Sequence, residues 1–268
     1  MSGTLYIVGT PIGNVGDMTA RGTETLRAVD FIYAEDTRHT RPLMDRCDIK
    51  KPLRSYHKFS ERETSAEIVA ELRAGKNIAL VTDAGMPCIS DPGAVLIRVA
   101  REEGMTVTAV PGPTAVTTAA ALSGMCEKGF AFYGFLPERK KDRDALIAEI
   151  SRLSVSVILY SAPHDVLNDL KYLFEQLGTR RVFVIKEITK MFETVYEGSL
   201  GEIEISDTRG EFVFVIAPSE AKKDFSDLAV REHVQNYIDG GLSKKDAIKQ
   251  TATDRGVHKS EIYKEVIE

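Results

Sequence analysis

The fold is decided by Val81-Thr82-Asp83-Ala84-Gly85-Met86-Pro87-Cys88-Ile89-Ser90-Asp91-Pro92-Gly93. This stretch directly follows the apolar run 78–81, and its Gly, Pro and Asp residues favour a tight loop over a continued strand. A strand that ends in such a loop before a helix-like segment leaves a notch at the carboxyl edge of a parallel sheet, where α/β proteins bind ligands. We therefore expect an α/β protein with its site at this loop.

The composition is that of an ordinary globular protein. Of the 268 residues 43% are hydrophobic, which is enough for a substantial core in one large or two medium domains. The formal net charge of −5 argues against a surface that is basic everywhere, although a local basic face is still allowed. Cys47, Cys88 and Cys126 lack the close spacing of zinc or redox motifs, so no metal site is expected. Without a signal-like start or a long apolar run, we expect a cytoplasmic protein with no membrane partner.

The pattern of apolar runs predicts two kinds of sheet. In the first half such runs alternate with helical patterns, which predicts a parallel sheet with helical crossovers. One of these helices should begin at a capping box formed by Ser60 and Glu63. In the second half the runs come closer together, so antiparallel pairing is expected. The expected strands are 5–8, 31–35, 53–56, 78–81 and 107–110, then 130–135, 155–160, 181–186, 192–196 and 212–217.

We predict two tandem α/β domains with a cleft between them and a small helical segment at the end. The N-terminal domain covers 1–123 and carries the parallel sheet, the second covers 124–223 with a mixed sheet, and the helical segment is 224–268. The helices of this last segment are short and charged, and would need each other or the main body for stability. Its basic cluster is either a solvated helix face or an RNA-contacting face.

Three turns should meet at one edge of the first sheet. Gly9-Thr10-Pro11-Ile12-Gly13-Asn14 follows the first strand, but Pro11 stands where the dinucleotide fingerprint needs its second glycine. Val110-Pro111-Gly112-Pro113-Thr114-Ala115 follows the fifth strand and begins a helix whose N–H groups face the same edge. Together with the loop after the fourth strand, these turns are expected to line one pocket.

Polar residues gather at other strand ends. Ala34-Glu35-Asp36-Thr37-Arg38-His39-Thr40 places two carboxylates, an Arg and a His together, although Asp36 or Thr37 could instead cap a helix. His57 ends the third strand beside Lys58. The segment 186–194 carries further charges, which either form ion pairs at the strand end or face the cleft and orient a hydroxyl or a phosphate.

The ordered motifs VGTPIGN (8–14), AEDTRHT (34–40), VTDAGMPCISDPG (81–93), VPGPTA (110–115), FYGFLP (132–137) and KEITKMFET (186–194) resemble the family of ribosomal RNA small subunit methyltransferase I. That family is similar to the tetrapyrrole methylases, and the resemblance spans essentially the whole chain. Tetrapyrrole methylases carry GGDP-like residues at the fourth strand, where this chain has Val81-Thr82-Asp83-Ala84. This departure favours the RNA-modifying branch.

The resemblance implies a homodimeric methyltransferase that holds S-adenosyl-L-methionine in the interdomain cleft. Its implied reaction is methylation of the ribose 2'-oxygen of a cytidine in the decoding region of 16S rRNA, within the small ribosomal subunit. Two alternatives stay open: a tetrapyrrole C-methyltransferase with the same fold and cofactor, and a noncatalytic RNA-binding factor of ribosome assembly. By position, the resemblance implies that the cofactor is bound by Thr10, Pro11, Ile12, Gly13, Thr82, Asp83, Ala84, Gly85, Met86, Thr114, Ala115, Ser161 and Ile188.

A ribose hydroxyl is a poor nucleophile until a base takes its proton, and such assistance is worth roughly 10²–10⁴-fold. The candidate bases are Glu35, Asp36, His57 and Glu187, and we expect Arg38 to hold a phosphate or the partner carboxylate. Asp83 is expected to shape the pocket rather than to act in catalysis. The residues expected to contact RNA are Lys58, Lys186, Lys190, Lys244, Lys245 and Lys259.

Overall fold

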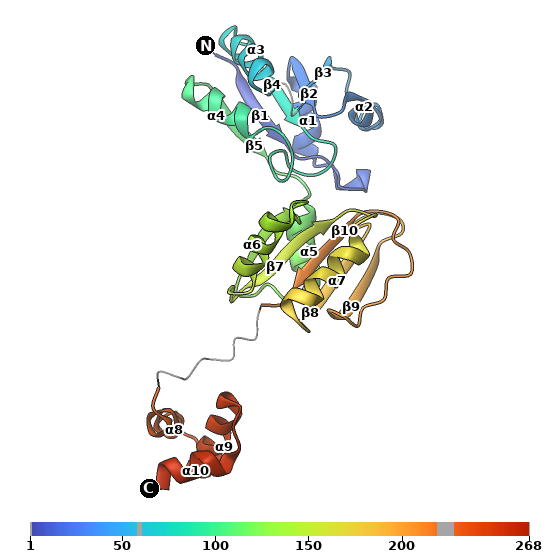
Figure 1. Cartoon of the computed structure of the whole chain (residues 1–268). Helices are drawn as coiled ribbons and strands as arrows, with labels where there is room; N and C mark the ends of the chain where they lie inside the picture. The colour runs from blue at the N-terminus through green and yellow to red at the C-terminus, as the bar shows by residue number, and fades with distance from the viewer. Residues whose placement is uncertain (1, 58–60, 219–227, 268) are drawn as a thin grey trace. The chain divides into compact units, whose positions relative to one another are not determined.

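The computed structural model describes residues 2–57, 61–218 and 228–267. The chain divides into two compact units, Met1–Pro218 and Ser219–Glu268, which we call the α/β unit and the helical unit (Figure 1). The predicted domain 1–123 and residues 124–218 of the second predicted domain fall within the α/β unit, and the boundary between these two domains stays a prediction. The expected helix start at Ser60 and the expected RNA contact Lys58 lie outside the described residues.

The first sheet of the α/β unit is parallel, as predicted, with strand order β3-β2-β4-β1-β5. β4 lies between β2 and β1 and is buried along its whole length, which explains its uninterrupted apolar sequence. Because the chain returns from β3 to the centre of the sheet, β1, β4 and β5 end side by side. The strands are β1 (Thr4–Val8), β2 (Phe31–Ala34), β3 (Leu53–Ser55), β4 (Ile78–Val81) and β5 (Thr106–Val110).

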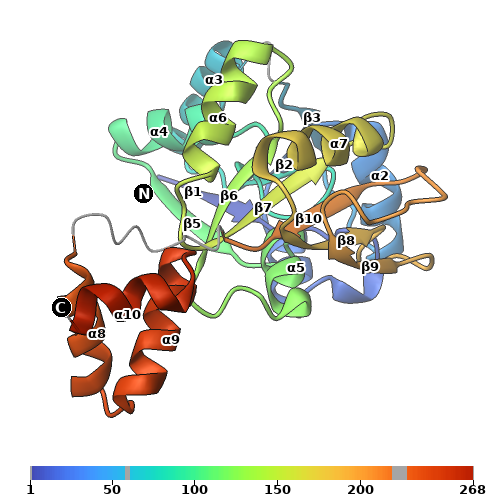
Figure 2. The ribbon, with the colours of Figure 1, turned by 60° about the horizontal axis from the view of Figure 1, so that its bottom comes forward.

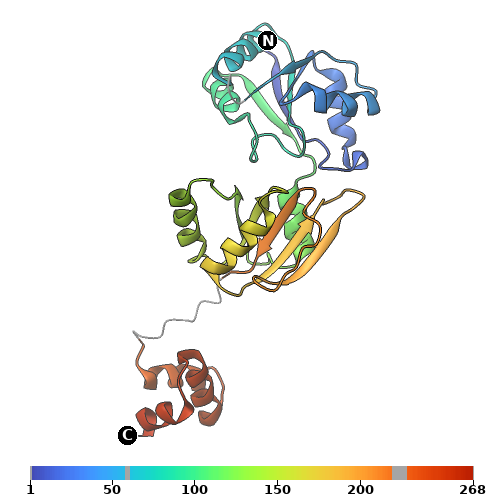
Figure 3. The ribbon, with the colours of Figure 1, turned by 45° about the vertical axis from the view of Figure 1, so that its right-hand side comes forward.

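Helices cover both faces of the first sheet (Figure 3). On one face Leu5 and Leu80 pack against the buried side chain of Ile68. On the other face Ile32 packs in a cluster with Leu26. These elements are the 3-10 turn η1 (Val15–Asp17) and the helices α1 (Ala20–Ala28), α2 (Thr37–Arg46), α3 (Glu61–Arg73) and α4 (Ala94–Glu102); α3 and α4 share the first face, α1 and α2 the second.

The second sheet is mixed, as predicted, with strand order β6-β7-β10-β8-β9. β6 and β7 run parallel, whereas β10 is antiparallel to both β7 and β8, and β9 is antiparallel to β8. The strand expected at 192–196 begins at residue 194 in the structure, because residues 187–193 form a tight turn. The strands are β6 (Phe130–Phe135), β7 (Ser156–Ser161), β8 (Arg181–Lys186), β9 (Thr194–Ser199) and β10 (Phe212–Ile216).

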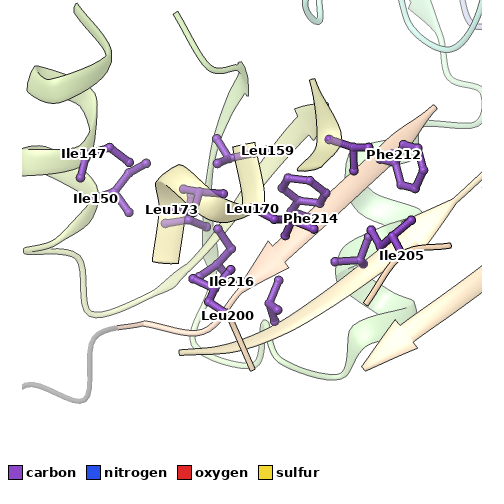
Figure 4. Close-up of a cluster of buried hydrophobic side chains, with 14 residues drawn as sticks. Ile147, Ile150, Leu159, Leu170, Leu173, Leu200, Ile205, Phe212, Phe214 and Ile216 are labelled. Carbon is purple, nitrogen blue, oxygen red and sulfur yellow. The ribbon is translucent and has the colours of Figure 1, made fainter. Parts of the chain in front are cut away.

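Side chains of the second sheet alternate between two apolar clusters. Figure 4 shows one of them, in which Phe212, Phe214 and Ile216 of β10 pack under α6 (Lys140–Ile150) and α7 (Val166–Leu177). The intervening Val213 and Val215 point to the other face and pack against α5 (Ala115–Ser123). Thus α5, which follows directly from the last strand of the first sheet, buries its apolar side on the second sheet.

The helical unit has its own small core. Its helices lie side by side (Figure 2). The residues buried between them are Val234, Ala247, Ile248, Ala252 and Ile262, and every one of these helices contributes to this cluster. Ser243 caps the helix that begins at Lys244, since its hydroxyl accepts the N–H of Asp246 at 3.2 Å. Among the residues that the structure describes, no helix is both long and apolar enough to cross a membrane. The helices are α8 (Val230–Asp239), α9 (Lys244–Arg255) and α10 (Lys259–Ile267).

Two glycines allow the turns after β1 and β5 to touch. A Cβ added at Gly112 would lie 2.9 Å from backbone atoms of Gly9, and one added at Gly9 would lie 2.8 Å from the backbone of Gly112. Real Cβ atoms essentially never make such contacts with backbone. Only glycine at both positions therefore allows the two strand ends to approach this closely.

Gly112→Ala is expected to lower the free energy of unfolding by about 1–3 kcal/mol, because the added methyl must push two backbone segments apart. Gly16→Ala is the control, since its added carbon would meet only the Asn14 side chain, at 3.1 Å, and it should change stability by less than about 0.5 kcal/mol. Urea unfolding followed by circular dichroism measures both. Equal stability of the two variants would contradict the assigned role of Gly112.

Candidate functional site

A cavity of about 390 Å³ lies where the carboxyl ends of the first sheet face the second sheet. It contains polar groups from the loop after β4 and from the strand ends of the second sheet, set among apolar side chains. This is the size and character of a small-molecule site. Its lining residues are Ile12, Glu35, Asp83, Ala84, Gly85, Met86, Ile89, Ser90, Asp91, Thr114, Ala115, Phe135, Tyr160, Ser161, Ala162, Pro163, Ile188, Glu211, Phe212 and Val213.

The predicted convergence of three turns is present. The backbone of Thr10 pairs with that of Gly85 through two hydrogen bonds of 2.9 and 3.1 Å, which joins the turns after β1 and β4. The Thr10 hydroxyl donates to the carbonyl of Thr82 at 3.2 Å, and both threonines are buried. The turn after β5 contributes Thr114, whose hydroxyl caps α5 by accepting the N–H of Thr117.

The residues predicted to bind a cofactor separate into two groups. Those on the cavity wall are Ile12, Asp83, Ala84, Gly85, Met86, Thr114, Ala115, Ser161 and Ile188.

The remaining predicted cofactor residues, Thr10, Pro11, Gly13 and Thr82, are not part of the described lining. Thr10 and Thr82 support the lining residues through the hydrogen bond from the Thr10 hydroxyl to the Thr82 carbonyl. Gly13 lies against the Lys190 side chain. Sequence spacing does not distinguish supporting residues from lining residues, because both kinds occur in the same turn.

Asp36 takes the structural role that the sequence left open. Its carboxylate caps α2 by accepting the N–H of Arg38 at 2.8 Å, and it also pairs with the Arg38 guanidinium, Nη2 to Oδ2, at 2.6 Å. The hydrogen bonds from Arg38 hold the pKa of the Asp36 carboxyl well below its usual range. A carboxylate held ionised in this way is a weak proton acceptor. The placement therefore counts against Asp36 as the base, while the neighbouring Glu35 lines the cavity.

Asp83 joins the loop after β4 to the start of α2. One carboxylate oxygen accepts the backbone N–H of Asp36 at 3.2 Å, and the other lies 2.9 Å from Nδ1 of His39. The hydrogen bond to Asp83 raises the pKa of His39, so the imidazole is charged over a wider pH range. These contacts agree with the expectation that Asp83 shapes the pocket.

The charges at 186–193 are used within the fold. Lys190 Nζ lies 2.8 Å from Glu187 Oε1 and 2.9 Å from Glu211 Oε2, and Lys186, nearly buried, pairs with Asp207 at 2.5 Å. Burial opposes ionisation of Glu187, but the hydrogen bonds that it accepts from Lys190 and from the Glu211 backbone lower its pKa. These pairings count against Glu187 as a base and against both lysines as open phosphate contacts.

The remaining predicted residues are not among the described lining residues of the cavity. His57 follows β3 at the edge of the first sheet and is not part of the described lining. Lys244, Lys245 and Lys259 are exposed on the helical unit. They are free to meet a large polyanion there.

Sequence reasoning missed Asp91. This residue belongs to the quoted loop, but an Asp before Pro and Gly reads as a turn residue, so no pattern marked its side chain as functional. In the structure it lines the cavity. Burial raises the pKa of Asp91 to about 6, and the Glu35 charge adds to the shift. A carboxyl that titrates near neutrality in a cleft is a candidate functional group.

The cavity is acidic. Glu35, Asp83, Asp91 and Glu211 line it, and no Lys, Arg or His is among its described lining residues. Such a wall favours a ligand that carries positive charge and disfavours a phosphate.

Comparison with known proteins identifies the family. A model of the Tetrapyrrole (Corrin/Porphyrin) Methylases matches residues 4–204. Ribosomal RNA small subunit methyltransferase I of Bacillus subtilis (strain 168) is 40% identical over 271 residues, which covers 97% of this chain and 93% of that protein. The chain belongs to the tetrapyrrole methylase family. The protein of the same name from Synechocystis sp. is 39% identical over 97% of this chain and 96% of its own length.

Membership of this methylase family confirms the resemblance drawn from the motifs and the prediction of a methyltransferase. A further relative of that name, from Thermotoga maritima, is 41% identical and aligns over 100% of its length with 81% of this chain. Among solved structures, diphthine synthase aligns with a TM-score of 0.65 at 15% identity, over 81% of this chain and 90% of its own. Uroporphyrin-III-C-methyltransferase from Thermus thermophilus aligns with a TM-score of 0.59 at 17% identity, over 80% and 94%. These likenesses support the α/β fold class.

Asp91→Asn is expected to stabilise the protein at pH 8. The folded state raises the pKa of Asp91 from 3.8 to about 6, so ionised Asp91 opposes folding; this penalty grows as the pH rises from 4 to 6 and stays constant above 6. Each pKa unit corresponds to about 1.4 kcal/mol, and with allowance for solvent screening the gain should be about 1–2 kcal/mol.

Thermal or urea unfolding at pH 4, 6 and 8 measures this difference, which should shrink toward pH 4. Asp45→Asn, on the exposed side of α2, is the control and should show no comparable gain. A variant at Asp91 that is less stable than the native protein at every pH would contradict the prediction.

Proposed function

We propose that this chain uses S-adenosyl-L-methionine to methylate the ribose 2'-oxygen of a cytidine in 16S rRNA. The observation that carries the proposal is the acidic cavity of a methylase fold in a chain 40% identical to a protein named for small-subunit ribosomal RNA methylation. The small ribosomal subunit is the proposed partner. The implied homodimer and cytoplasmic location stay predictions.

The cavity fits this cofactor chemically. S-adenosyl-L-methionine carries a sulfonium and an ammonium group, and the carboxylates of Glu35, Asp83 and Asp91 supply the matching negative charge. Its adenine needs apolar contacts, which Ile12, Met86, Ile89, Phe135 and Ile188 can provide. When bound, the cofactor supplies an electrophilic methyl group.

The protein contributes mainly position, which can be worth an effective molarity of about 10⁵ M or more. The loop carrying Asp83 is held to α2 and to the turn after β1, so its backbone groups are preorganised. Phe135 and Tyr160 pack edge to face with ring centroids 5.6 Å apart, and both line the cavity. Arg38 leaves 86% of its side chain exposed beside Asp36 and can meet a phosphate outside the acidic cavity.

The alternatives have less support. For tetrapyrrole C-methylation, the uroporphyrin-III-C-methyltransferase likeness is limited to 17% identity, against 40% for the ribosomal RNA methyltransferase. In a noncatalytic assembly factor, the half-buried Asp91 carboxylate would lower the stability of the fold without serving a reaction.

Methyl transfer from radiolabelled S-adenosyl-L-methionine tests the proposal. Small ribosomal subunits lacking the modification, naked 16S rRNA and a porphyrinogen are offered in parallel. Label is expected in the ribose of one cytidine. Label in the porphyrinogen alone, or cofactor binding with no transfer to any substrate, would refute the proposal.

The helical unit is proposed to hold the RNA rather than to take part in the chemistry. Its exposed lysines include Lys244, Lys245 and Lys259, whereas the cavity is built wholly from the α/β unit. The Thermotoga relative carries the same name although it matches only 81% of this chain. Methyl transfer in such proteins therefore does not need a counterpart of the whole chain.

Replacing Lys244, Lys245 and Lys259 together by Ala is expected to weaken binding to 16S rRNA and to reduce the salt slope of log Kd by about 2–3, as expected for two or three lost phosphate contacts. The affinity for S-adenosylhomocysteine, measured by calorimetry, should not change. A control with Lys140, Lys141 and Lys171 replaced on the α/β unit keeps the same net charge change. An equal loss in both triple variants would contradict a specific role of the helical unit.

A further inference from the structure

The proposed reaction needs a proton acceptor, and most of the candidate carboxylates at the site are already engaged in ion pairs. Asp36 is held by Arg38, Glu187 by Lys190, and Asp83 by His39. Glu211 is also bound to Lys190 and leaves 74% of its side chain exposed. Each of these carboxylates already has a cation or an imidazole as its partner.

Asp91 differs in how the fold holds it. The loop after β4 closes at Gly93, whose N–H donates to Glu61 Oε1 at 3.0 Å and whose φ is +131°. A Cβ at Gly93 would lie 2.8 Å from both Cys88 Sγ and Leu80 Cδ2, so the loop is packed tightly against the end of β4. Residue 91 is thereby fixed on the cavity wall, between Ser90 and the helix α4.

The groups around Asp91 are acidic or neutral. Glu35 from the end of β2 and Asp83 from its own loop add negative charge, and the Thr82 hydroxyl donates a hydrogen bond to it. Tyr160 of the second sheet lines the same cavity, and burial together with the Asp91 charge raises the pKa of Tyr160 to about 12, so this phenol is neutral. Cys88 is likewise a neutral thiol, its pKa raised to about 11 by burial and by Asp91. Among the described residues Asp91 has no cationic partner.

We propose that the Asp91 carboxylate, on the cavity wall that it shares with Glu35, accepts the proton of the ribose 2'-hydroxyl during methyl transfer. This deepens the proposed function and rests on it. A lone pair of the ribose oxygen forms the bond to the methyl carbon, and the carbon–sulfur bond breaks with its electrons left on sulfur. The O–H proton passes to Asp91, which becomes a neutral carboxylic acid and later releases the proton to water.

The position of Asp91 suits both partners of this step. While ionised it offers negative charge to a cationic ligand in the same cavity, and its neutralisation accompanies the loss of the sulfonium charge. A base with a pKa just below the working pH is ionised most of the time and still takes a proton readily, which is the favourable range for general base catalysis. Asp36, held ionised by Arg38, is outside that range.

Single-turnover methyl transfer to small ribosomal subunits, measured from pH 5 to 9, tests the assignment. The native protein should lose rate below about pH 6 as Asp91 becomes protonated. Asp91→Asn should lower the rate by about 10²–10⁴-fold and remove this acidic limb. Glu35→Gln should keep the limb but move it to lower pH, because a neighbouring negative charge is gone.

Two further measurements separate a catalytic from a structural role. Binding of S-adenosylhomocysteine, which lacks the sulfonium charge that Asp91 would match, is measured by calorimetry and should stay within about threefold of the native protein in Asp91→Asn. Asp45→Asn should match the native rate at every pH. A slow Asp91→Asn variant that binds normally and unfolds no earlier than the native protein supports the assignment.

Two outcomes would overturn it: an Asp91→Asn rate within about twofold of native, or a limb that survives in Asp91→Asn and disappears in Glu35→Gln, which would make Glu35 the acceptor. If the native protein itself transfers no methyl group to the subunit, the proposed function fails, and that result is distinct from a failure of the Asp91 assignment.

Discussion

The backbone pairing of Thr10 with Gly85 is the contact on which the rest of the site depends. It joins the ends of two neighbouring parallel strands, and the approach of Gly9 to Gly112 adds the end of a third. Because strand ends in a parallel sheet otherwise diverge into separate loops, these contacts are what turn three loops into one continuous wall. Where these loops touch, the side chains must be small or buried, and the contacts are accordingly made by Gly and Thr. The polar lining residues come from neighbouring positions of the same loops.

Electrostatics then divides the carboxylates of the site by their partners. Asp36 and Glu187 each accept charged hydrogen bonds, which lower the pKa of both carboxyls, and they serve to fix the start of α2 and the turn after β8. Asp91 has the opposite environment, with burial and the charge of Glu35 making its ionised form costly. The same residue type thus provides rigid structure in one place and a titrating group in another. Such a separation of pKa values by environment is how proteins assign acid and base roles.

Much of the fold could be predicted from local pattern. The bounds of the strands 78–81, 130–135 and 181–186 agree with the structure, because each is a short apolar run bounded by turn residues. In the structure, the strand expected at 192–196 begins two residues later than its apolar run indicates. The turn before it is closed by backbone hydrogen bonds, which an apolar run does not reveal. The sheet against which helix α5 packs could not be predicted. Its apolar side chains indicate that the helix packs against a sheet, but they do not indicate which of the two sheets. At the site, Glu35 and Asp36 could not be separated, since adjacent residues share every local signal.

The sequence by itself determined the family, the α/β class, the parallel and mixed sheets, and the turns that meet at the site, because these follow from motifs and from periodicities of two and 3.6 residues. Only the tertiary structure decided which polar residues face the cavity and which are used to hold it. That distinction depends on partners far apart in the chain, such as Asp83 with His39, Lys186 with Asp207 and Asp91 with Glu35. The charge state of a carboxylate is set by burial and by neighbours within a few ångströms, and neither can be read from its position in a sequence.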